Sequence, residues 1–477
     1  MNVLRDVQLL GWVLVALAVA QLVPAGCAIW WGEPPLPYLA SAIAAGVTGL
    51  PVALGSEPID RQIRVRDGFV IATGTWLLAA TFGALPFIFA DALDPVDALF
   101  EAVSGFTTTA ASVIASVESL PRALVLWRAM TQWLGGMGVL VVAVALLPFL
   151  GIGGMQLFSS GASNVASDPG RPRFAPTASR LFRVYLGLTA LAFVLLTIAG
   201  LGPFDAFCHA LTSVSTGGFS TRDGSVGSFG SAAVEWVVVA MMFLGATSFV
   251  VHDRIATGRA RGLMRDGELR YYAGTLVVAS GVLIWILADL DPEPGAVRPA
   301  IFQAVSMMSG TGYHTADFEN WGGFAQLVLL LLMVLGGMSG STTGGIKSLR
   351  LLIGLRALRD SFMPLLHPHA VRRVKYAGRI VSDEVISAIW AFFTAYFLIV
   401  AAAAALVATA GYDLITSVSA GFSLTANVGP ALGDVGPNHG FAHLPSYVKL
   451  GLSACMVAGR LDVFTVLVLL QPRFWRD

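Results

Sequence analysis

Four short polar stretches lie between long apolar runs, and their residue types suit the coordination of a cation. They are Thr107-Thr-Thr-Ala-Ala111, Ser215-Thr-Gly-Gly-Phe219, Gly310-Thr-Gly-Tyr313 and Asn427-Val-Gly-Pro430. Glycine permits backbone conformations in which successive carbonyl oxygens turn toward one axis, and threonine adds hydroxyl oxygens. For a single stretch, close packing of small residues between membrane helices would be the better explanation. Four stretches in equivalent positions favour a cation pore.

Each polar stretch follows a short, partly apolar segment that we predict to be a helix. The predicted helix starts lie 13 residues before the stretch centres, at Asp97, Asp205, Pro299 and Thr416. Three of these residues can cap a helix N-terminus, and a proline suits a first turn. The negative C-terminal end of each helix dipole would face the polar stretch and favour a cation there.

The composition is that of a membrane protein. Of the 477 residues, 56% are hydrophobic and 12% are charged, and the net charge of zero gives no electrostatic support for a nucleic-acid partner. Cys27, Cys208 and Cys455 lie in apolar stretches and are predicted to be core residues. The N-terminal apolar run is long and has no cleavage pattern, so we expect a retained transmembrane helix.

The apolar runs predict an all-α integral membrane protein with ten transmembrane helices in the lipid bilayer. The expected spans are 7–31, 34–54, 68–90, 124–150, 179–200, 230–252, 271–290, 322–358 (interrupted), 384–410 and 444–470. The stretch centres at 110, 218, 312 and 429 are 108, 94 and 117 residues apart, which indicates an internal repeat. We therefore predict an N-terminal helix pair followed by four helix–pore-loop–helix repeats in a pseudo-fourfold arrangement. Their limits are 1–66 for the pair and 67–178, 179–270, 271–380 and 381–477 for the repeats.

Charge placement supports this threading. With the N-terminus in the cytoplasm, all but six of the 29 Lys and Arg residues fall on the cytoplasmic side, as the positive-inside rule requires. The six exceptions are Arg122, Arg128, Arg222, Arg298, Lys449 and Arg460. The opposite side, which carries the four polar stretches, holds acidic residues including Asp91, Asp94, Asp291, Glu293 and Asp434. An acidic outer mouth would concentrate cations.

A glycine-rich segment interrupts the eighth expected span. Glycines at this density cost about 1 kcal/mol each in a helix relative to alanine, and broken transmembrane helices often mark sites or gates. We predict a gate here, although a flexible kink is the alternative. A phosphate-binding loop is a poor explanation because no strand precedes the segment. The expected gate residues are Gly336, Gly337, Gly340, Ser341, Thr342, Thr343, Gly344, Gly345 and Lys347, together with Arg460.

Two ionisable residues in apolar surroundings require a role. Arg460 lies in the middle of the last expected span, where a charge is costly and usually functional. It would act as a barrier to cations or anchor carbonyls of the glycine-rich segment; a purely structural role is the alternative. Glu101, in the first short helix, is predicted to brace the loop by hydrogen bonding. His367 and His369 have no third partner for a metal, and no catalytic set is visible.

Taken together, these motifs resemble the Trk/Ktr/HKT superfamily of potassium transporters, most closely the bacterial Trk-type pore subunits. The resemblance extends over nearly the whole chain. It rests on Asp97-Ala-Leu-Phe-Glu-Ala-Val-Ser-Gly-Phe-Thr-Thr-Thr, Trp133-Leu-Gly-Gly-Met-Gly, Gly151-Ile-Gly-Gly-Met-Gln, Gly217-Gly-Phe-Ser-Thr221, Gly340-Ser-Thr-Thr-Gly-Gly-Ile-Lys347, Gly459-Arg460 and Phe474-Trp.

The resemblance implies K⁺ uptake across the bacterial inner membrane through a gated pore with a selectivity filter. It also implies a homodimer, no cofactor beyond K⁺ as the transported ion, and regulation by a separate cytoplasmic nucleotide-binding subunit (TrkA-like). No metal site other than K⁺ at the filter is expected, and the chain is not expected to be an enzyme. The implied filter residues are Thr108, Thr109, Ala110, Thr216, Gly217, Gly218, Gly310, Thr311, Gly312, Asn427, Val428 and Gly429.

Ala110 departs from the family pattern, because glycine usually occupies this position. Alanine does not readily adopt positive φ, so we expect its carbonyl to turn away or the site to narrow. In the family, a residue other than glycine here is associated with Na⁺ permeation, which predicts reduced K⁺/Na⁺ discrimination. The alternative function is a Na⁺- or H⁺-coupled cation or solute symporter, which would usually contain two inverted repeats. A membrane enzyme would need acid/base pairs or ligands that the sequence does not show.

Overall fold

The computed structural model describes residues 3–55, 65–146, 174–260, 262–290, 296–363 and 373–476. Several sequence features lie outside these ranges: the motif at 151–156, Asp291, Glu293, His367 and His369. The described elements are α1 (Val3–Trp31), α2 (Leu36–Leu54), α3 (Val65–Phe89), α4 (Pro95–Phe106), α5 (Arg122–Leu146), α7 (Phe174–Ile198), α8 (Pro203–Val214), η1 (Ser225–Phe229), α9 (Ala232–Gly245), α10 (Phe249–Ala256), η2 (Leu263–Arg265), α11 (Gly267–Leu290), α12 (Val297–Ser309), η3 (Phe318–Trp321), α13 (Gly322–Val334), α14 (Ser348–Ser361), β1 (Lys375–Tyr376), β2 (Arg379–Ile380), α16 (Asp383–Ala408), α17 (Leu414–Ala426), η4 (Gly433–Val435), α18 (Ser446–Arg460), α19 (Val463–Leu469) and α20 (Pro472–Arg476).

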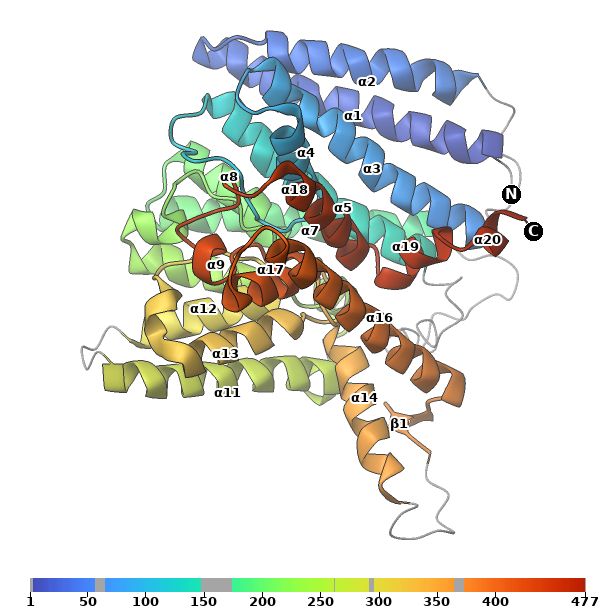
Figure 1. The fold of residues 1–477 in the computed structure, drawn as a ribbon, viewed down its shortest axis with the longest axis vertical. Coiled ribbons are helices and arrows are strands. Elements are labelled where there is room, and N and C mark those ends of the chain that lie inside the picture. Colours follow the sequence, from blue (N-terminus) through green and yellow to red (C-terminus); the bar gives the residue numbers. More distant parts are fainter. Residues whose placement is uncertain are drawn as a thin grey trace.

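Long apolar helices form a bundle with their axes roughly side by side (Figure 1). By length and hydropathy, six described helices can cross a membrane: α1, α2, α3, α7, α11 and α16. Two bent pairs raise the number to eight. Large apolar side chains on the outer faces of these helices are exposed, among them Leu22, Val47, Val194, Val277 and Leu398. Because so much apolar surface would be unfavourable in water, the helices fit a multi-pass membrane protein.

Two of the expected continuous spans are broken. The span predicted over 230–252 consists of α9 and α10, which meet at an angle of 99°, and that predicted over 444–470 consists of α18 and α19, at 115°. Asp462, in the second break, has a φ of 64°. Arg460 therefore lies at the end of α18, next to the break that divides the expected span 444–470, and not within a continuous helix. The apolar composition of the two expected spans gave no indication of either bend.

Four short helices, α4, α8, α12 and α17, are embedded among the long ones, and each is followed by an irregular loop (Figure 1). All four start 15 residues before Ala110, Gly218, Gly312 or Gly429, at Pro95, Pro203, Val297 and Leu414. The constant offset was predicted, but every start lies two residues earlier than expected.

The capping residues were also misassigned. The side chains of Asp94 and Asp413 cap α4 and α17, whereas the N-caps of α8 and α12 are Gly202 and Ala296. The predicted caps instead tie the helix starts to outer segments. Asp97 pairs with Lys449 at 2.5 Å, Asp205 accepts from Thr221 Oγ1 at 2.6 Å, and Thr416 Oγ1 accepts from the Asp434 amide at 3.1 Å.

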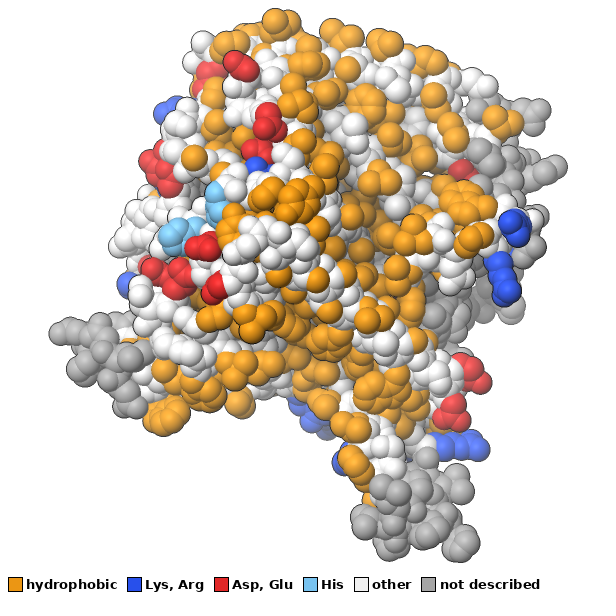
Figure 2. Space-filling view, viewed as in Figure 1, with side chains coloured by type: hydrophobic (Ala, Val, Ile, Leu, Met, Phe, Trp, Pro, Cys, Tyr) orange, Lys and Arg blue, Asp and Glu red, His pale blue; other side chains and the backbone are white. Residues whose placement is uncertain are grey.

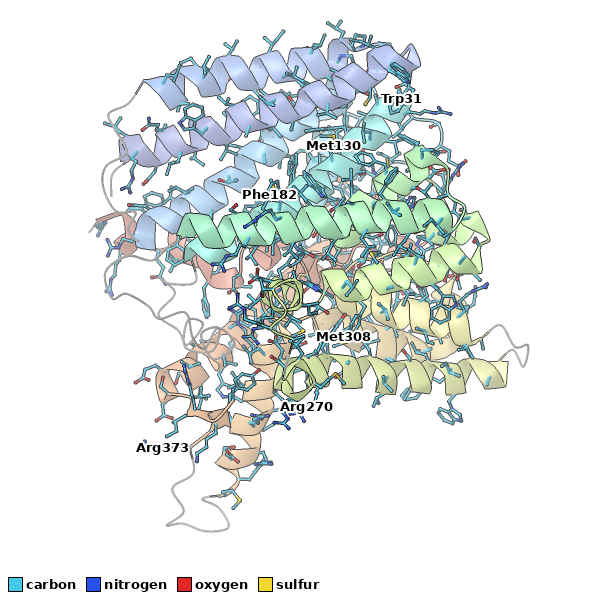
Figure 3. The ribbon with its side chains drawn as sticks, turned by 180° about the vertical axis from the view of Figure 1, so that it is seen from behind. Trp31, Met130, Phe182, Arg270, Met308 and Arg373 are labelled. Atoms are coloured by element: carbon cyan, nitrogen blue, oxygen red, sulfur yellow. The ribbon has the colours of Figure 1, made fainter. Side chains whose placement is uncertain are left out.

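Two large apolar clusters surround the short helices. One joins α1, α3, α4, α5, α17 and α18 around Phe100, Trp127 and Leu452, and the other joins α7 to α13 around Tyr185, Phe302 and Leu329. Trp31 and Arg373 lie toward opposite ends of the bundle (Figure 3). Acidic and histidine side chains gather at the left end in Figure 2, the end at which the short helices begin. The clusters hold the short helices and their loops between the long ones.

Candidate functional site

Each short helix is followed by a set of three residues, here called a triplet, and the four triplets share a pattern of positive φ angles. The triplets are 108–110, 216–218, 310–312 and 427–429. Positive φ occurs at the first position in all four (Thr108 53°, Thr216 51°, Gly310 67°, Asn427 57°) and again at the third (Ala110 63°, Gly218 83°, Gly312 79°, Gly429 104°). Ala110 thus adopts the left-handed conformation, although alanine was expected to avoid positive φ. Its neighbours impose that conformation at a cost on the order of 1 kcal/mol.

The four triplets meet and close a ring. A Cβ built on Gly218 would lie 1.7 Å from the Thr311 carbonyl oxygen, and one built on Gly312 would lie 2.0 Å from that of Val428. A Cβ on Gly429 would lie 2.2 Å from the Thr109 carbonyl oxygen. The Ala110 methyl lies 2.9 Å from the Cβ positions of both Gly218 and Gly429. The structure therefore brings all twelve sequence-predicted residues together. At positions 218, 312 and 429 only glycine fits.

Backbone oxygens within this ring have few hydrogen-bond partners. Within the described ranges, the carbonyls of Thr109, Thr311 and Val428 accept no hydrogen bond, although their residues are buried. A buried carbonyl without a donor is costly unless water or an ion reaches it. The Thr109 and Thr311 hydroxyls are instead engaged with Thr107 and Ser309, at 2.6 and 2.7 Å. Those two hydroxyls shape the loop.

Glu101 on α4 braces the segment that follows the first triplet, as predicted. Its carboxylate accepts from the Ser112 hydroxyl at 3.1 Å and from the Val113 amide at 2.9 Å. His209 occupies the equivalent place on α8 and contacts Ser220 Oγ at 3.0 Å. Glu101 and His209 lie equally far before their triplets. The first and second loops are therefore held by side chains at equivalent positions of the preceding short helix.

Arg128 and Gln132, one turn apart on α5, are site residues that the sequence analysis missed. Arg128 is buried, donates to Glu101 at 2.5 Å and lies 3.7 Å above the Phe219 ring. Gln132 donates through Nε2 to the Gly217 carbonyl at 2.6 Å and accepts from the Phe219 amide at 2.9 Å. Polar residues at i and i+4 in an expected span were the available indication, because such residues usually face the protein interior.

The segment 336–345 is irregular and lies against the triplets. A Cβ on Gly344 would lie 2.2 Å from the Ala426 carbonyl oxygen and 2.8 Å from Asn427 Cβ. A bridge between Leu335 and Ile346 closes the base of the segment. The predicted interruption of the eighth span is therefore present, between α13 and α14, and the segment contacts the third and fourth loops.

Side chains hold this segment from several directions. Thr342 Oγ1 donates to the Val214 and Gly245 carbonyls at 3.2 and 3.1 Å, and Met338 N donates to the Ala246 carbonyl at 2.9 Å. The Lys347 ammonium donates to the Thr343 carbonyl and lies 3.0 Å from its hydroxyl.

Arg460 connects the last bent helix pair to the segment. It is buried, and its Nη1 donates to the Thr342 carbonyl at 2.7 Å, which realises the predicted contact with carbonyls of the glycine-rich segment. Its Nε and Nη2 have no partner among the described residues. Asp462 pairs separately with Arg350 on α14, whose guanidinium lies 4.2 Å from the Phe392 ring.

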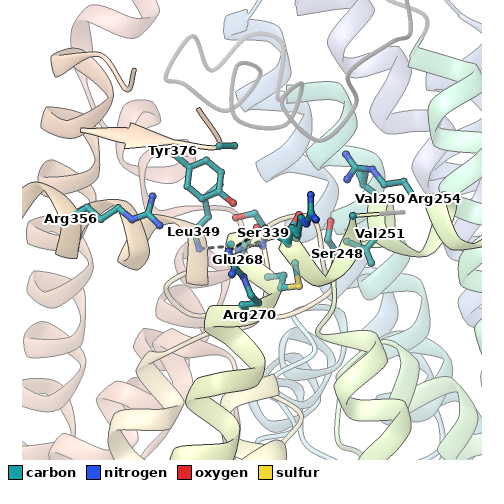
Figure 4. A pocket seen from close by; sticks show the side chains of 16 residues that line it. Ser248, Val250, Val251, Arg254, Glu268, Arg270, Ser339, Leu349, Arg356 and Tyr376 are labelled. Carbon is teal, nitrogen blue, oxygen red and sulfur yellow. Dashed lines mark hydrogen bonds between the residues drawn. The ribbon is translucent and has the colours of Figure 1, made fainter. Parts of the chain in front are cut away.

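A cavity of about 330 Å³ lies at the Arg-rich end, beside the segment (Figure 4). The side chains of Arg254, Arg270 and Arg356 line it, and Glu268 joins its wall to the segment. The Glu268 carboxylate accepts from the Ser339 amide at 2.6 Å and from the Leu349 amide at 3.1 Å. Glu268 thus fixes the start of the segment to the start of α14, a role that the sequence analysis did not foresee.

The described residues contain no group of three or more His, Cys, Asp or Glu side chains that could hold a metal ion. The oxygen atoms gathered at the four triplets are mainly backbone carbonyls, and the buried Thr108 Oγ1 and Asn427 Oδ1, which have no partner among the described residues, belong to the same triplets. Such oxygens suit a weakly held alkali cation that exchanges water for protein oxygen.

The amino-acid sequence is similar to those of known cation transport proteins. The model of the TrkH family, described as a cation transport protein, matches residues 40–476. The Trk system potassium uptake protein TrkH of Halomonas elongata is 38% identical over 451 residues, which cover 92% of each chain. The corresponding protein of Escherichia coli is 36% identical over 423 residues, 87% of each chain.

A solved structure agrees over the full length. The crystal structure of the potassium transporter TrkH from Vibrio parahaemolyticus superposes with a TM-score of 0.93 at 33% identity and covers 100% of both chains. By these matches in sequence and structure, the chain belongs to the TrkH family of cation transport proteins.

Proposed function

We propose that this protein takes up K⁺ across the bacterial inner membrane through a gated pore, with the four triplets as its selectivity filter. The observation that carries the proposal is the ring of triplets, in which buried carbonyls lack protein donors. A dehydrated K⁺ ion would supply the partner that these oxygens lack. The names of the relatives, which are potassium uptake proteins, support the same ion.

The proposed architecture has ten transmembrane helices. To the six long helices and two bent pairs it adds α5 and the interrupted pair α13 and α14. An N-terminal pair (1–66) would precede four repeats, at 67–178, 179–270, 271–380 and 381–477, around one pseudo-fourfold axis. The equal spacing from each short helix to its triplet, and the repeated pair of positive φ angles, support this division.

Segment 336–345 is the proposed gate. It packs directly against Asn427 and the end of α17, so an ion that leaves the filter on the Arg-rich side would meet it. The guanidinium of Arg460 adds positive charge there and anchors the segment through Thr342. Displacement of the segment would open the path and remove that charge from it.

The partners are proposed from the family resemblance. The protein would form a homodimer, and a cytoplasmic nucleotide-binding subunit would regulate it. The Arg-lined cavity beside the gate lies on the side proposed to be cytoplasmic, where a regulator could act on Ser339 and α14. Purified protein in detergent should have the mass of two chains in light scattering, and a monomer would contradict this part of the proposal.

Ion flux in proteoliposomes tests the function directly. Protein reconstituted with no organic solute should take up ⁸⁶Rb⁺, a K⁺ substitute, and unlabelled K⁺ should compete. Flux that requires a solute or an imposed Na⁺ or H⁺ gradient would favour the symporter alternative. Absence of ⁸⁶Rb⁺ flux under all of these conditions would refute the pore.

The first prediction concerns Ala110. We expect Ala110→Gly to raise discrimination of K⁺ over Na⁺, because glycine relieves the strain of positive φ and removes a methyl from the ring. Competition of ⁸⁶Rb⁺ uptake by K⁺ and by Na⁺ gives the ratio, and we expect roughly a twofold or larger rise, equivalent to about 0.4 kcal/mol. An unchanged ratio would contradict the assigned role of Ala110.

A further inference from the structure

The ring of triplets has a regular order that is broken at one place. The Cβ position of each third residue faces the carbonyl of the second residue in the next triplet: 218 faces 311, 312 faces 428 and 429 faces 109. Continued by one step, this order makes position 110 face the carbonyl of Gly217. Position 110, however, carries a real methyl group.

A methyl group and a carbonyl oxygen cannot share this space. In the three regular steps the Cβ-to-oxygen distance would be 1.7, 2.0 and 2.2 Å, whereas real Cβ atoms essentially never come within 3.0 Å of another heavy atom. With alanine at 110, the Gly217 carbonyl cannot occupy the position that the other three carbonyls take relative to their neighbours. It must turn elsewhere or move the loop.

The Gly217 carbonyl has a partner that the other three lack. Gln132 Nε2 donates to it at 2.6 Å, and within the described residues no donor reaches the carbonyls of Thr109, Thr311 or Val428. The Phe219 amide donates to Gln132 Oε1 at 2.9 Å, which fixes the orientation of the side-chain amide. A Cβ built on Gly217 would lie only 2.3 Å from that same Oε1, so the loop is pressed against Gln132.

We infer that the Ala110 methyl and the Gln132 amide together hold the Gly217 carbonyl out of the ion-binding ring, so that three carbonyls remain at a level where four would otherwise stand. Gln132 is then a positioning residue for ion selectivity that acts through Gly217. This inference rests on the proposed filter function.

The Ala110 methyl and the Gln132 amide act on the Gly217 carbonyl in different ways, so their effects can be separated by mutation. Removing the methyl alone frees the space, but Gln132 still competes for the carbonyl. Removing the amide alone leaves the methyl in place, so the carbonyl still cannot enter the ring. Only removal of both should let Gly217 complete the ring.

A double-mutant cycle tests the inference. The variants are Ala110→Gly, Gln132→Met and the double variant, each purified and reconstituted. The readout is the K⁺/Na⁺ ratio, that is, how much more strongly K⁺ than Na⁺ inhibits ⁸⁶Rb⁺ uptake. Maximal flux is measured separately. We expect Gln132→Met alone to raise the ratio much less than the double variant does, because the Ala110 methyl still excludes the carbonyl. The fold-change in the K⁺/Na⁺ ratio of the double variant should exceed the product of the two single-variant fold-changes by at least about fivefold. This corresponds to a coupling free energy of about 1 kcal/mol.

The control is a matched glutamine outside the filter. Gln21 on α1 is also buried and donates through Nε2 to a backbone carbonyl, that of Phe82 at 3.0 Å. Gln21→Met should show no coupling to Ala110→Gly. If Gln132→Met is not monodisperse in size-exclusion chromatography, Gln132→Asn, whose amide ends one methylene short, takes its place in the cycle.

The outcomes are distinguishable. The inference would be overturned if the K⁺/Na⁺ ratio of the double variant changed, relative to wild type, only by the product of the two single-variant fold-changes while flux was retained. The proposed pore would then remain intact. A Gln132→Met variant that alone raises the ratio as much as the double variant would show that the methyl does not matter, and would also overturn it. Wild-type protein without ⁸⁶Rb⁺ flux would instead refute the proposed function.

Discussion

Arg460 places a positive charge close to the proposed ion path. A buried guanidinium must be paired or hydrogen-bonded, and this one makes its observed bond to the Thr342 carbonyl within the glycine-rich segment. The nearby carboxylate of Asp462 is already paired with Arg350. Arg460 therefore remains available to hold the segment and to repel cations below the filter.

Arg460→Ala should raise basal ⁸⁶Rb⁺ flux. Loss of a charge-assisted hydrogen bond of about 1.5–3 kcal/mol would shift the segment toward displaced positions by roughly tenfold or more. The matched control is Arg298→Ala, whose guanidinium pairs with Glu235 on α9 and is 44% exposed. Flux of Arg460→Ala equal to wild type, in protein that remains monodisperse, would argue against a gate at this position.

At the residue scale, the sequence predicts which residues gather but not how each backbone group points. The four polar stretches were recognised from residue type and spacing, and the family resemblance implied the twelve triplet residues, which do meet. The left-handed conformation of Ala110 was not foreseen, because intrinsic preference is weaker than the constraint from its neighbours. The partner of the Gly217 carbonyl could not be predicted either, since it depends on Gln132, 85 residues away in the chain.

Glycines determine how closely the long helices approach the loops. Gly135 on α5 and Gly459 on α18 each contact a triplet-bearing segment so closely that no Cβ fits: the nearest backbone oxygens, of Phe106 and Thr425, would lie at 2.1 and 1.9 Å. Small residues allow such backbone contacts between membrane helices. The motifs that contain these two glycines are therefore explained by packing against the loops.

Gly459→Ala should destabilise the protein and reduce flux. The added methyl would push α18 away from Thr425, at a cost of about 1–3 kcal/mol or more, and would displace the adjacent Arg460. Gly281→Ala on α11 is the control, because a Cβ there meets nothing within 4 Å. Thermal unfolding in detergent should show a lower Tm for the first variant only. Equal Tm values would mean that this close approach is not needed.

At the element scale, apolar length and composition predict the long helices well and their ends poorly. The offset between short helix and triplet was recognised, but Asp94 and Asp413, not Asp97 and Thr416, cap the helices. Both aspartates immediately precede the true first turn and were equally visible in the sequence. The bends between α9 and α10 and between α18 and α19 had no comparable local indication, since apolar residues continue on both sides.

Across the whole molecule, charge divides the two ends of the bundle. Acidic side chains gather where the short helices begin, and the Arg-lined cavity and α14 lie toward the other end (Figures 2 and 3). Because basic segments stay in the cytoplasm during insertion, this division sets the orientation. It also places the acidic end where it would attract cations from outside the cell.

Thiol labelling can test this orientation in a background in which Cys27, Cys208 and Cys455, the free cysteines of the described chain, are replaced by alanine. Asn438→Cys, at the acidic end, should react with a membrane-impermeant maleimide in intact spheroplasts, because Asn438 is exposed there. Arg359→Cys on α14 should react only after permeabilisation, although its side chain is 75% exposed. The reverse pattern would invert the topology and move the proposed gate to the outer face. The acidic end would then face the cytoplasm and could not concentrate external cations at the filter.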